Sequence, residues 1–283
     1  MFSGVAIVIL FGGFINMCKN KLQLDWLSFS WVPKNLVKNG YYFESSDVLD
    51  EFLNVFPELK HDYVTDQLYL MDSGKRFYDN FLVFGDSWGI RYDNNMLSNK
   101  GVNVEIHPSG LEFWFDLFDF KHDDLESLFS ELIKRNCHIS RIDLCFDDYN
   151  KTFSPSWYNK RAINNCIVSG AHSFEYIGPC TGDRGGTFYI PARTSQMRRK
   201  MLRIYDKGTE SNGEIDAIRY EFTLNHQVAH DTVVKMLLEK RFDFKGFISG
   251  FLSVKEFSDD VNKSRKPDCK EWFDWVNNLE FSE

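Results

Sequence analysis

Four short segments of this chain alternate apolar and polar residues with a period of two, and this pattern is the strongest constraint on its fold. The segments are VNVEIH (102–107), SRIDLCFDD (140–148), LRIYDK (202–207) and IRYEFTL (218–224). A β-strand sends alternate side chains to opposite faces, so each segment predicts a strand with one apolar and one ionisable face. Strands of a parallel sheet that is covered on both sides would be more uniformly apolar. The pattern therefore predicts antiparallel sheets with one face against the core.

Local patterns elsewhere in the chain complete an α+β prediction. Further strands are predicted at residues 22–31, within 78–90, at 111–117 after a turn at Pro108–Gly110, and at 187–190. Helices are predicted from Asp47 to Leu53, with Ser46 as the N-cap, and over 123–135, 158–169 and 227–241, with a linker at 152–158. We expect an α+β fold of antiparallel sheets with helices packed on one face, built from a duplicated α+β unit. The expected core is 17–257, with halves of about 17–150 and 151–257, and 258–283 form a C-terminal tail.

The ionisable faces of the four strands carry residue types suited to phosphoryl transfer. If the strands are neighbours, their polar residues form one patch that contains Glu105, His107, Asp143, Asp147, Tyr205, Lys207, Glu221 and several arginines. Carboxylates and an imidazole can hold a hard divalent ion, arginine and lysine can offset developing charge, and a tyrosine hydroxyl can attack phosphorus. The alternative is that these residues form the ordinary cross-strand ion pairs of a half-exposed sheet.

The charge of the chain is divided between its halves. The net charge of −8 disfavours non-specific binding to nucleic acid. Residues 1–150 hold 13 Lys and Arg against 23 Asp and Glu, whereas 151–283 hold 20 against 18. Seven basic residues lie within 184–207, and we expect four of them to bind DNA: Arg193, Arg198, Arg199 and Lys200. A solvated run of charge is the alternative.

Cysteines and the N-terminal residues bear on the compartment. None of the six cysteines lies in a CxxC pair, and Cys137, Cys145 and Cys166 are expected to be small buried hydrophobes, so we expect a reduced, cytoplasmic protein.

The apolar run from Val5 to Ile15 is too short to span a bilayer. We expect residues 1–16 to be an extension of the gene start, with translation beginning at Met17 and no stable membrane partner; a membrane anchor is the alternative.

Several motifs occur in an order that resembles the Rep_trans family, the replication initiation factors of rolling-circle plasmids and filamentous phages. The family is also similar to relaxases of some integrative elements. The motifs are LDWLSFS (24–30), GVNVEI (101–106), SRIDLCFDD (140–148), GTFYI (186–190), LRIYDKG (202–208), IRYEF (218–222) and WFDW (272–275). Each motif is weak alone, but the ordered set is fairly specific.

The resemblance implies a site-specific DNA nicking and closing enzyme. Tyr205, in the RIYDK motif, would attack one strand at an origin and leave a 5′-phosphotyrosyl link and a free 3′-OH. Arg203 and Lys207 would stabilise the developing charge or lower the pKa of the phenol from about 10.

The resemblance also implies a cofactor and partners. The divalent ion, Mg²⁺ or Mn²⁺, would be held by Glu105, Asp143 and Glu221, with His107 as a candidate further ligand. The expected substrate is single-stranded or cruciform origin DNA. A host helicase and a second copy of the chain are candidate partners.

Two departures from the family pattern leave alternatives open. Residues 191–199 read PARTSQMRR where many members have a Gly-Ser-Arg-Lys run, and little chain follows the last predicted strand for an added origin-recognition domain. The alternatives are a conjugative relaxase, a non-catalytic DNA-binding regulatory protein of the same fold, and a metal-dependent phosphodiesterase that uses water.

Overall fold

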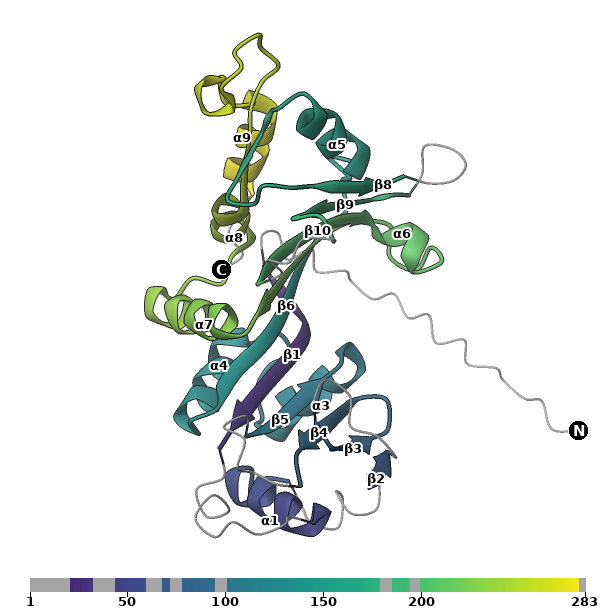
Figure 1. Ribbon diagram of the computed structural model, residues 1–283, viewed down its shortest axis with the longest axis vertical. Helices are drawn as coiled ribbons and strands as arrows, with labels where there is room; N and C mark the ends of the chain where they lie inside the picture. The colour runs from purple at the N-terminus through teal and green to yellow at the C-terminus, as the bar shows by residue number, and fades with distance from the viewer. Residues whose placement is uncertain are drawn as a thin grey trace, which may run out of the picture.

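One large antiparallel sheet organises the molecule. The computed structural model describes residues 21–32, 44–59, 68–71, 78–94, 101–178, 185–193 and 199–279. Within these ranges ten strands pair antiparallel in the order β2-β3-β4-β5-β1-β6-β11-β10-β9-β8 (Figure 1). The strands are β1 (Gln23–Trp31), β2 (Leu68–Met71), β3 (Asn80–Phe84), β4 (Trp88–Tyr92), β5 (Val102–Ile106), β6 (His138–Asp148), β8 (Glu175–Ile177), β9 (Thr187–Ile190), β10 (Lys200–Asp206) and β11 (Ile218–Asn225). The predicted antiparallel α+β fold is therefore confirmed.

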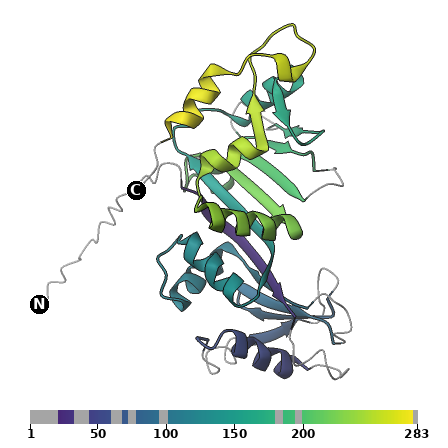
Figure 2. The same ribbon diagram turned by 90° about the vertical axis from the view of Figure 1, so that its left-hand side faces the viewer.

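Helices cover the apolar face of this sheet. They are α1 (Ser45–Val55), α3 (Pro108–Leu117), α4 (Leu125–Lys134), α5 (Pro155–Ile163), α7 (Gln227–Glu239), α8 (Phe244–Phe251) and α9 (Lys270–Asn278). The short helix α6 (Lys207–Glu210) follows β10 and has no buried residue. Figure 2 shows α4 and α7 in front of the central strands, on the side to which the apolar residues of β6 point. Ile142 and Leu144 of that strand are fully buried there. The ionisable face of the sheet points the other way.

The two halves of the sheet have the same order of strands. In the first half, β1 is followed by the antiparallel run β2 to β5, and β5 returns to pair with β1. In the second half, β6 is followed by the run β8 to β11, and β11 returns to pair with β6. Strands β1 and β6 pair with each other and join the halves. This agreement supports the duplicated unit, which itself stays a prediction.

The segment after Pro108 is a helix, so the predicted turn and strand at 108–117 are wrong. Proline is tolerated at the first position of a helix, where its missing N–H would be unsatisfied in any case. Leu111, Trp114 and Phe115 then share a buried helical face. Trp114 packs edge-on against Phe29 of β1, so α3 becomes part of the core.

The start of the second half also differs from the prediction. Helix α5 begins at Pro155 after a Ser154 cap whose side chain accepts the backbone N–H of Trp157, so part of the predicted linker is helical. The segment at Ile167–Ser169 is the strand β7, which pairs with β12 (Leu252–Val254) in a separate two-stranded sheet. The predicted helix over 158–169 is therefore wrong in its second part. Helix α1 begins at Ser45, two residues earlier than expected, with Glu44 rather than Ser46 as its N-cap.

The C-terminal tail contributes a helix to the core. Trp272 and Val276 of α9 are buried, and the indole N–H of Trp272 donates to the Tyr158 hydroxyl. At the other end, the proposed extension 1–16 and Met17 lie outside the described residues. No helix among the described residues is long and apolar enough to cross a membrane. Cys137, Cys145 and Cys166 are buried and free, as expected.

Candidate active site

Tyr205 lies on the ionisable face of the sheet, at the centre of a cross-strand group. It is opposite Arg219 of β11, and the next pair on the same face is Arg203 and Glu221. The Tyr205 hydroxyl donates to Oε2 of Glu221 at 3.1 Å, and the same oxygen accepts from Nη2 of Arg203 at 2.5 Å. The Arg203 guanidinium carbon also lies 4.4 Å from the centre of the Tyr205 ring. The phenol, the carboxylate and the guanidinium are therefore in direct contact.

Burial determines the protonation of this group. Tyr205 is only 5% exposed, and burial raises the pKa of its phenol well above 10. The Glu221 carboxylate raises the phenol pKa further, and Arg203 and Arg219 lower it by less than the other two effects raise it. Arg203 lowers the phenol pKa, as predicted, but burial and Glu221 outweigh it, so the net pKa lies above 10. The phenol is protonated in this state, and an attack by its oxygen requires a proton acceptor.

Glu221 is placed to be that acceptor. Burial raises the pKa of its carboxyl above 4.5, and the carboxylates of Asp25 and Asp143 add to this rise, although Arg203 opposes it. A raised carboxyl pKa brings a base closer to the proton affinity that general-base catalysis requires.

Arg203 has an unused donor beside the phenol. Its Nη2 reaches Glu221 and Tyr205, whereas its buried Nε has no hydrogen-bond partner among the described residues. A buried donor without a partner costs free energy, so such groups in native proteins commonly receive a ligand or a water. This donor could take an oxygen of an anionic group that approaches Tyr205.

Two arginines hold three other carboxylates of this face. Arg219 donates to both carboxylate oxygens of Asp147 at 2.7 Å and to Asp25 at 3.1 Å. Arg141 donates to both oxygens of Asp143 at 3.0 and 2.5 Å. The result is a row of charge-assisted contacts that continues from β10 across β11 to β6 and β1.

The candidate site also contains Asp25, a residue that the sequence analysis did not single out. A register shift between Leu24 and Trp26 interrupts the alternation of β1, and Asp25 then reaches Arg219 on the ionisable face. Burial raises the pKa of Asp25, and Arg219 lowers it by less. Leu24 and Leu27 are both buried although they are three positions apart, whereas residues on one face of a regular strand are separated by an even number of positions. This odd spacing of apolar residues is the signal in the sequence for the bulge.

The family model of the replication initiation factors, Rep_trans, matches residues 137–282, just over half of the chain. The chain belongs to this family. The structure is also similar to that of a rolling circle replication initiator protein from Geobacillus stearothermophilus, with a TM-score of 0.68 at 19% sequence identity. That similarity covers 92% of this chain and 96% of the other. A search of curated proteins gives no significant match.

In this Rep_trans protein the three predicted metal ligands do not lie together. Glu221 on β11 is close to Asp143 on β6. The residue directly opposite Asp143 is Thr223, which follows Glu221 by two positions on the same face of β11. Glu105 on β5 is separated from them by β1, and it accepts from Arg91 at 3.2 Å and contacts His107 at 3.1 Å.

The carboxylates do not form a ready metal centre. Among the described residues no group of three or more His, Cys, Asp or Glu side chains is arranged to hold an ion. Glu105, Asp143 and Glu221 are each paired with a different arginine. An ion at Asp143 and Glu221 would have to replace arginine contacts.

The predicted DNA-binding residues of this family member lie on different parts of the surface. Arg193, after β9, pairs with Glu175 of β8 at 3.0 Å. Arg199 is exposed just before β10, and Arg198 lies outside the described residues. Lys207 follows Tyr205 at the start of α6, with its Nζ 2.5 Å from Glu210 and 5.9 Å from the Tyr205 ring centre.

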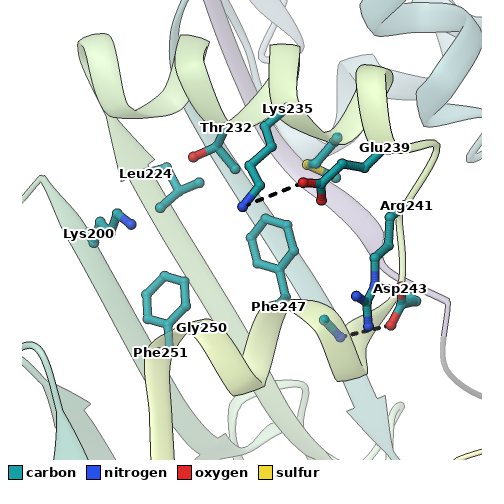
Figure 3. A pocket seen from close by; sticks show the side chains of 12 residues that line it. Lys200, Leu224, Thr232, Lys235, Glu239, Arg241, Asp243, Phe247, Gly250 and Phe251 are labelled. Carbon is teal, nitrogen blue, oxygen red and sulfur yellow. Dashed lines mark hydrogen bonds and ion pairs between the residues drawn. The ribbon is translucent and has the colours of Figure 1, made fainter.

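Lys200 lies on the other side of the sheet from Tyr205. It shares a face with Leu202 and Ile204, because residues two apart on a strand point the same way. Figure 3 shows it beside Leu224 and Phe251, at a pocket of about 250 Å³ bordered by α7 and α8. Lys200 and Tyr205, which both lie within the basic segment 184–207, are therefore on opposite faces of the sheet.

Proposed function

We propose that this protein is a rolling-circle replication initiator that nicks and rejoins single-stranded origin DNA through a covalent bond to Tyr205. The contact of the Tyr205 hydroxyl with Glu221 and Arg203 carries this proposal, because it joins a nucleophile, a proton acceptor and a cation. Membership of the Rep_trans family and the fold shared with a rolling circle replication initiator support it.

In the nicking step, the Tyr205 oxygen attacks the phosphorus of one phosphodiester. The Tyr205 proton passes to the Glu221 carboxylate, the bond from phosphorus to the 3′ oxygen breaks, and that oxygen takes a proton from solvent. The products are a 5′-phosphotyrosyl link and a free 3′-OH. Attack of that hydroxyl on the phosphotyrosine reverses the step and rejoins the strand.

Arg203 stabilises the charge that develops on phosphorus. Its Nε, which lacks a partner among the described residues, would donate to a non-bridging phosphate oxygen while Nη2 keeps Glu221 in place. Burial lowers the pKa of Arg203, but Glu221, Tyr205 and Glu210 together raise it above its usual value, so the guanidinium is charged.

The requirement for Mg²⁺ or Mn²⁺ stays a prediction from the resemblance to the family. Asp143 and Glu221, with Asp25 close by, are the carboxylates that could hold the ion on the Tyr205 face. An ion bound there would polarise a phosphate oxygen.

The test is covalent capture of DNA by the purified protein. Wild type is incubated with Mn²⁺ and a labelled single strand carrying the origin of its own element, and the adduct is resolved in a denaturing gel. Tyr205→Phe is expected to form no adduct. Tyr189→Phe is the matched control, because Tyr189 lies on the same face directly opposite Arg203, whereas the hydroxyl that donates to Glu221 is that of Tyr205.

Two outcomes would contradict the proposal. An adduct formed by Tyr205→Phe would show that another residue is the nucleophile. If Tyr189→Phe then formed no adduct, Tyr189 would be identified as that nucleophile. No adduct with wild type, together with specific binding of the same strand, would favour the non-catalytic DNA-binding protein.

A further inference from the structure

A row of stacked planar groups lies on the Tyr205 face of the sheet, across the neighbouring strands β5, β1 and β6. The indole of Trp26 on β1 stacks on the imidazole of His107, with ring centres 4.4 Å apart and planes 28° apart. The guanidinium carbon of Arg141 on β6 lies 4.6 Å from the Trp26 ring. We call His107, Trp26 and Arg141 the stacking row.

Hydrogen bonds hold the stacking row in position. The indole N–H of Trp26 donates to the Ser28 hydroxyl at 3.0 Å, and His107 contacts the Glu105 carboxylate. Arg141 is fixed by its two bonds to Asp143, a carboxylate of the candidate site. The planes are therefore preorganised, and binding to them would cost little side-chain entropy.

The row is also accessible. The side chains of His107 and Arg141 are 33% and 27% exposed, and Trp26 is half-buried. Residues such as Leu27 and Phe29, on the other face of β1, are fully buried against the helices. Half-exposed aromatic and guanidinium planes on an otherwise polar face are suited to a planar ligand, and unpaired nucleobases stack on such groups.

The distance to Tyr205 suits a single strand that passes across the sheet. Strand β1, which carries Trp26, is three strands from β10, which carries Tyr205. Trp26 is opposite Asp143 of β6, and Tyr205 is in register with Asp147 of the same strand, four residues further on. Strand spacing and rise per residue place the two Cα atoms roughly 20 Å apart. At about 3.4 Å per stacked nucleotide, this corresponds to about six nucleotides.

We propose that the stacking row is a nucleobase subsite that binds one unpaired base of the substrate strand, within about six nucleotides of the phosphate attacked by Tyr205. This inference rests on the proposed function, because it takes single-stranded DNA as the ligand. It assigns Trp26 and His107 a role in positioning the strand and none in the chemical step.

The test places the fluorescent base 2-aminopurine at successive positions on both sides of the nick site, in strands bound to the non-cleaving Tyr205→Phe protein. Quenching is expected at one or two positions within six nucleotides of the nick, and Trp26→Leu in the same background should abolish it. Trp157→Leu is the matched control, because Trp157 has a similar contact with Arg161, at 4.7 Å, on α5.

Kinetics separate binding from chemistry. In the otherwise wild-type protein, Trp26→Leu should raise the DNA concentration for half-maximal nicking about tenfold and leave the rate at saturation within about twofold. His107→Ala should raise the same concentration by a smaller factor, and it serves as a second variant if Trp26→Leu does not fold.

The outcomes distinguish this inference from the proposed function. Normal nicking with no quenched position, or with unchanged half-saturation in both variants, would overturn the subsite and leave the function standing. Quenching that depends on Trp26 in a protein that never forms an adduct would support the subsite and overturn the nicking function.

Discussion

Glu221 connects the two groups on which the proposed chemistry depends. It accepts the Tyr205 hydroxyl and the Arg203 guanidinium through the same oxygen. Burial raises the pKa of both Tyr205 and Glu221, so the phenol keeps its proton and the carboxylate becomes a better acceptor. A residue predicted as a metal ligand is thus more directly placed to act as a base.

The pH dependence of adduct formation should report Glu221. Because its pKa lies above 4.5, the rate should rise with pH through that raised value as the carboxyl loses its proton. Glu221→Gln should lower the rate by about 10²–10⁴ and remove the rising limb. Single-turnover rates from pH 4 to 8 measure this, with Glu256→Gln as a control that pairs with Arg161 of α5 instead. A rising limb retained in Glu221→Gln would exclude it as the base.

Asp25 should affect stability in the opposite sense to a usual aspartate. Burial raises its pKa above 3.8, so the folded state binds the proton more tightly than the unfolded state does. That contribution to stability is complete below pH 3.8 and is lost as pH rises through the folded pKa. At pH 8, the melting temperature of Asp25→Asn should therefore be no lower than that of wild type. Any increase in melting temperature should become smaller as the pH is lowered toward 3.5. A loss of melting temperature that grows with pH would contradict this sign.

At the scale of elements, periodicity predicted the strands better than the helices. Segments 102–107, 140–148, 202–207 and 218–224 became β5, β6, β10 and β11 because only a period of two fits them. LEFWFDL (111–117) fits both periods, since Leu111, Phe113, Phe115 and Leu117 alternate while Leu111, Trp114 and Phe115 lie on one helical face. Packing against β1 selects the helix, and this packing is not visible in the local sequence.

Helix α3 should therefore depend on Trp114. The side chain is fully buried and contacts Phe29, Phe56 and Trp88 edge-on. Trp114→Ala should lower the free energy of unfolding by about 3–5 kcal/mol, measured by urea denaturation. Phe113→Ala, on the partly buried side of the same helix, should cost less. Equal losses would indicate that α3 does not pack as described.

The candidate site could be predicted only in part. Alternation alone places Arg203, Tyr205 and Glu221 on ionisable faces, and it also puts Lys200 on the opposite face. Asp25 could not be found in this way because a bulge interrupts β1. Glu105 could not be separated from Asp143, since periodicity does not reveal that β1 lies between their strands.

At the scale of the molecule, the pairing of β1 with β6 joins the two halves of the large sheet. The family match begins at 137, but β6 needs β1 as its neighbour and α4 lies against α7. A fragment of residues 137–282 should therefore fail to give a folded monomer, as measured by size-exclusion chromatography and circular dichroism. A protein lacking residues 1–16 is the control, and it should keep both its fold and its nicking activity. A folded, DNA-binding fragment would show that the first half is dispensable.

The identity of the residue that becomes joined to DNA tests the central claim most directly. The adduct formed with Mn²⁺ and origin DNA is digested with protease and nuclease, and the nucleotide-bearing peptide is sequenced by mass spectrometry. We expect a 5′-phosphate on the Tyr205 side chain, within the peptide that contains LRIYDKG. A phosphate attached to Tyr189 or to any other residue would contradict the account.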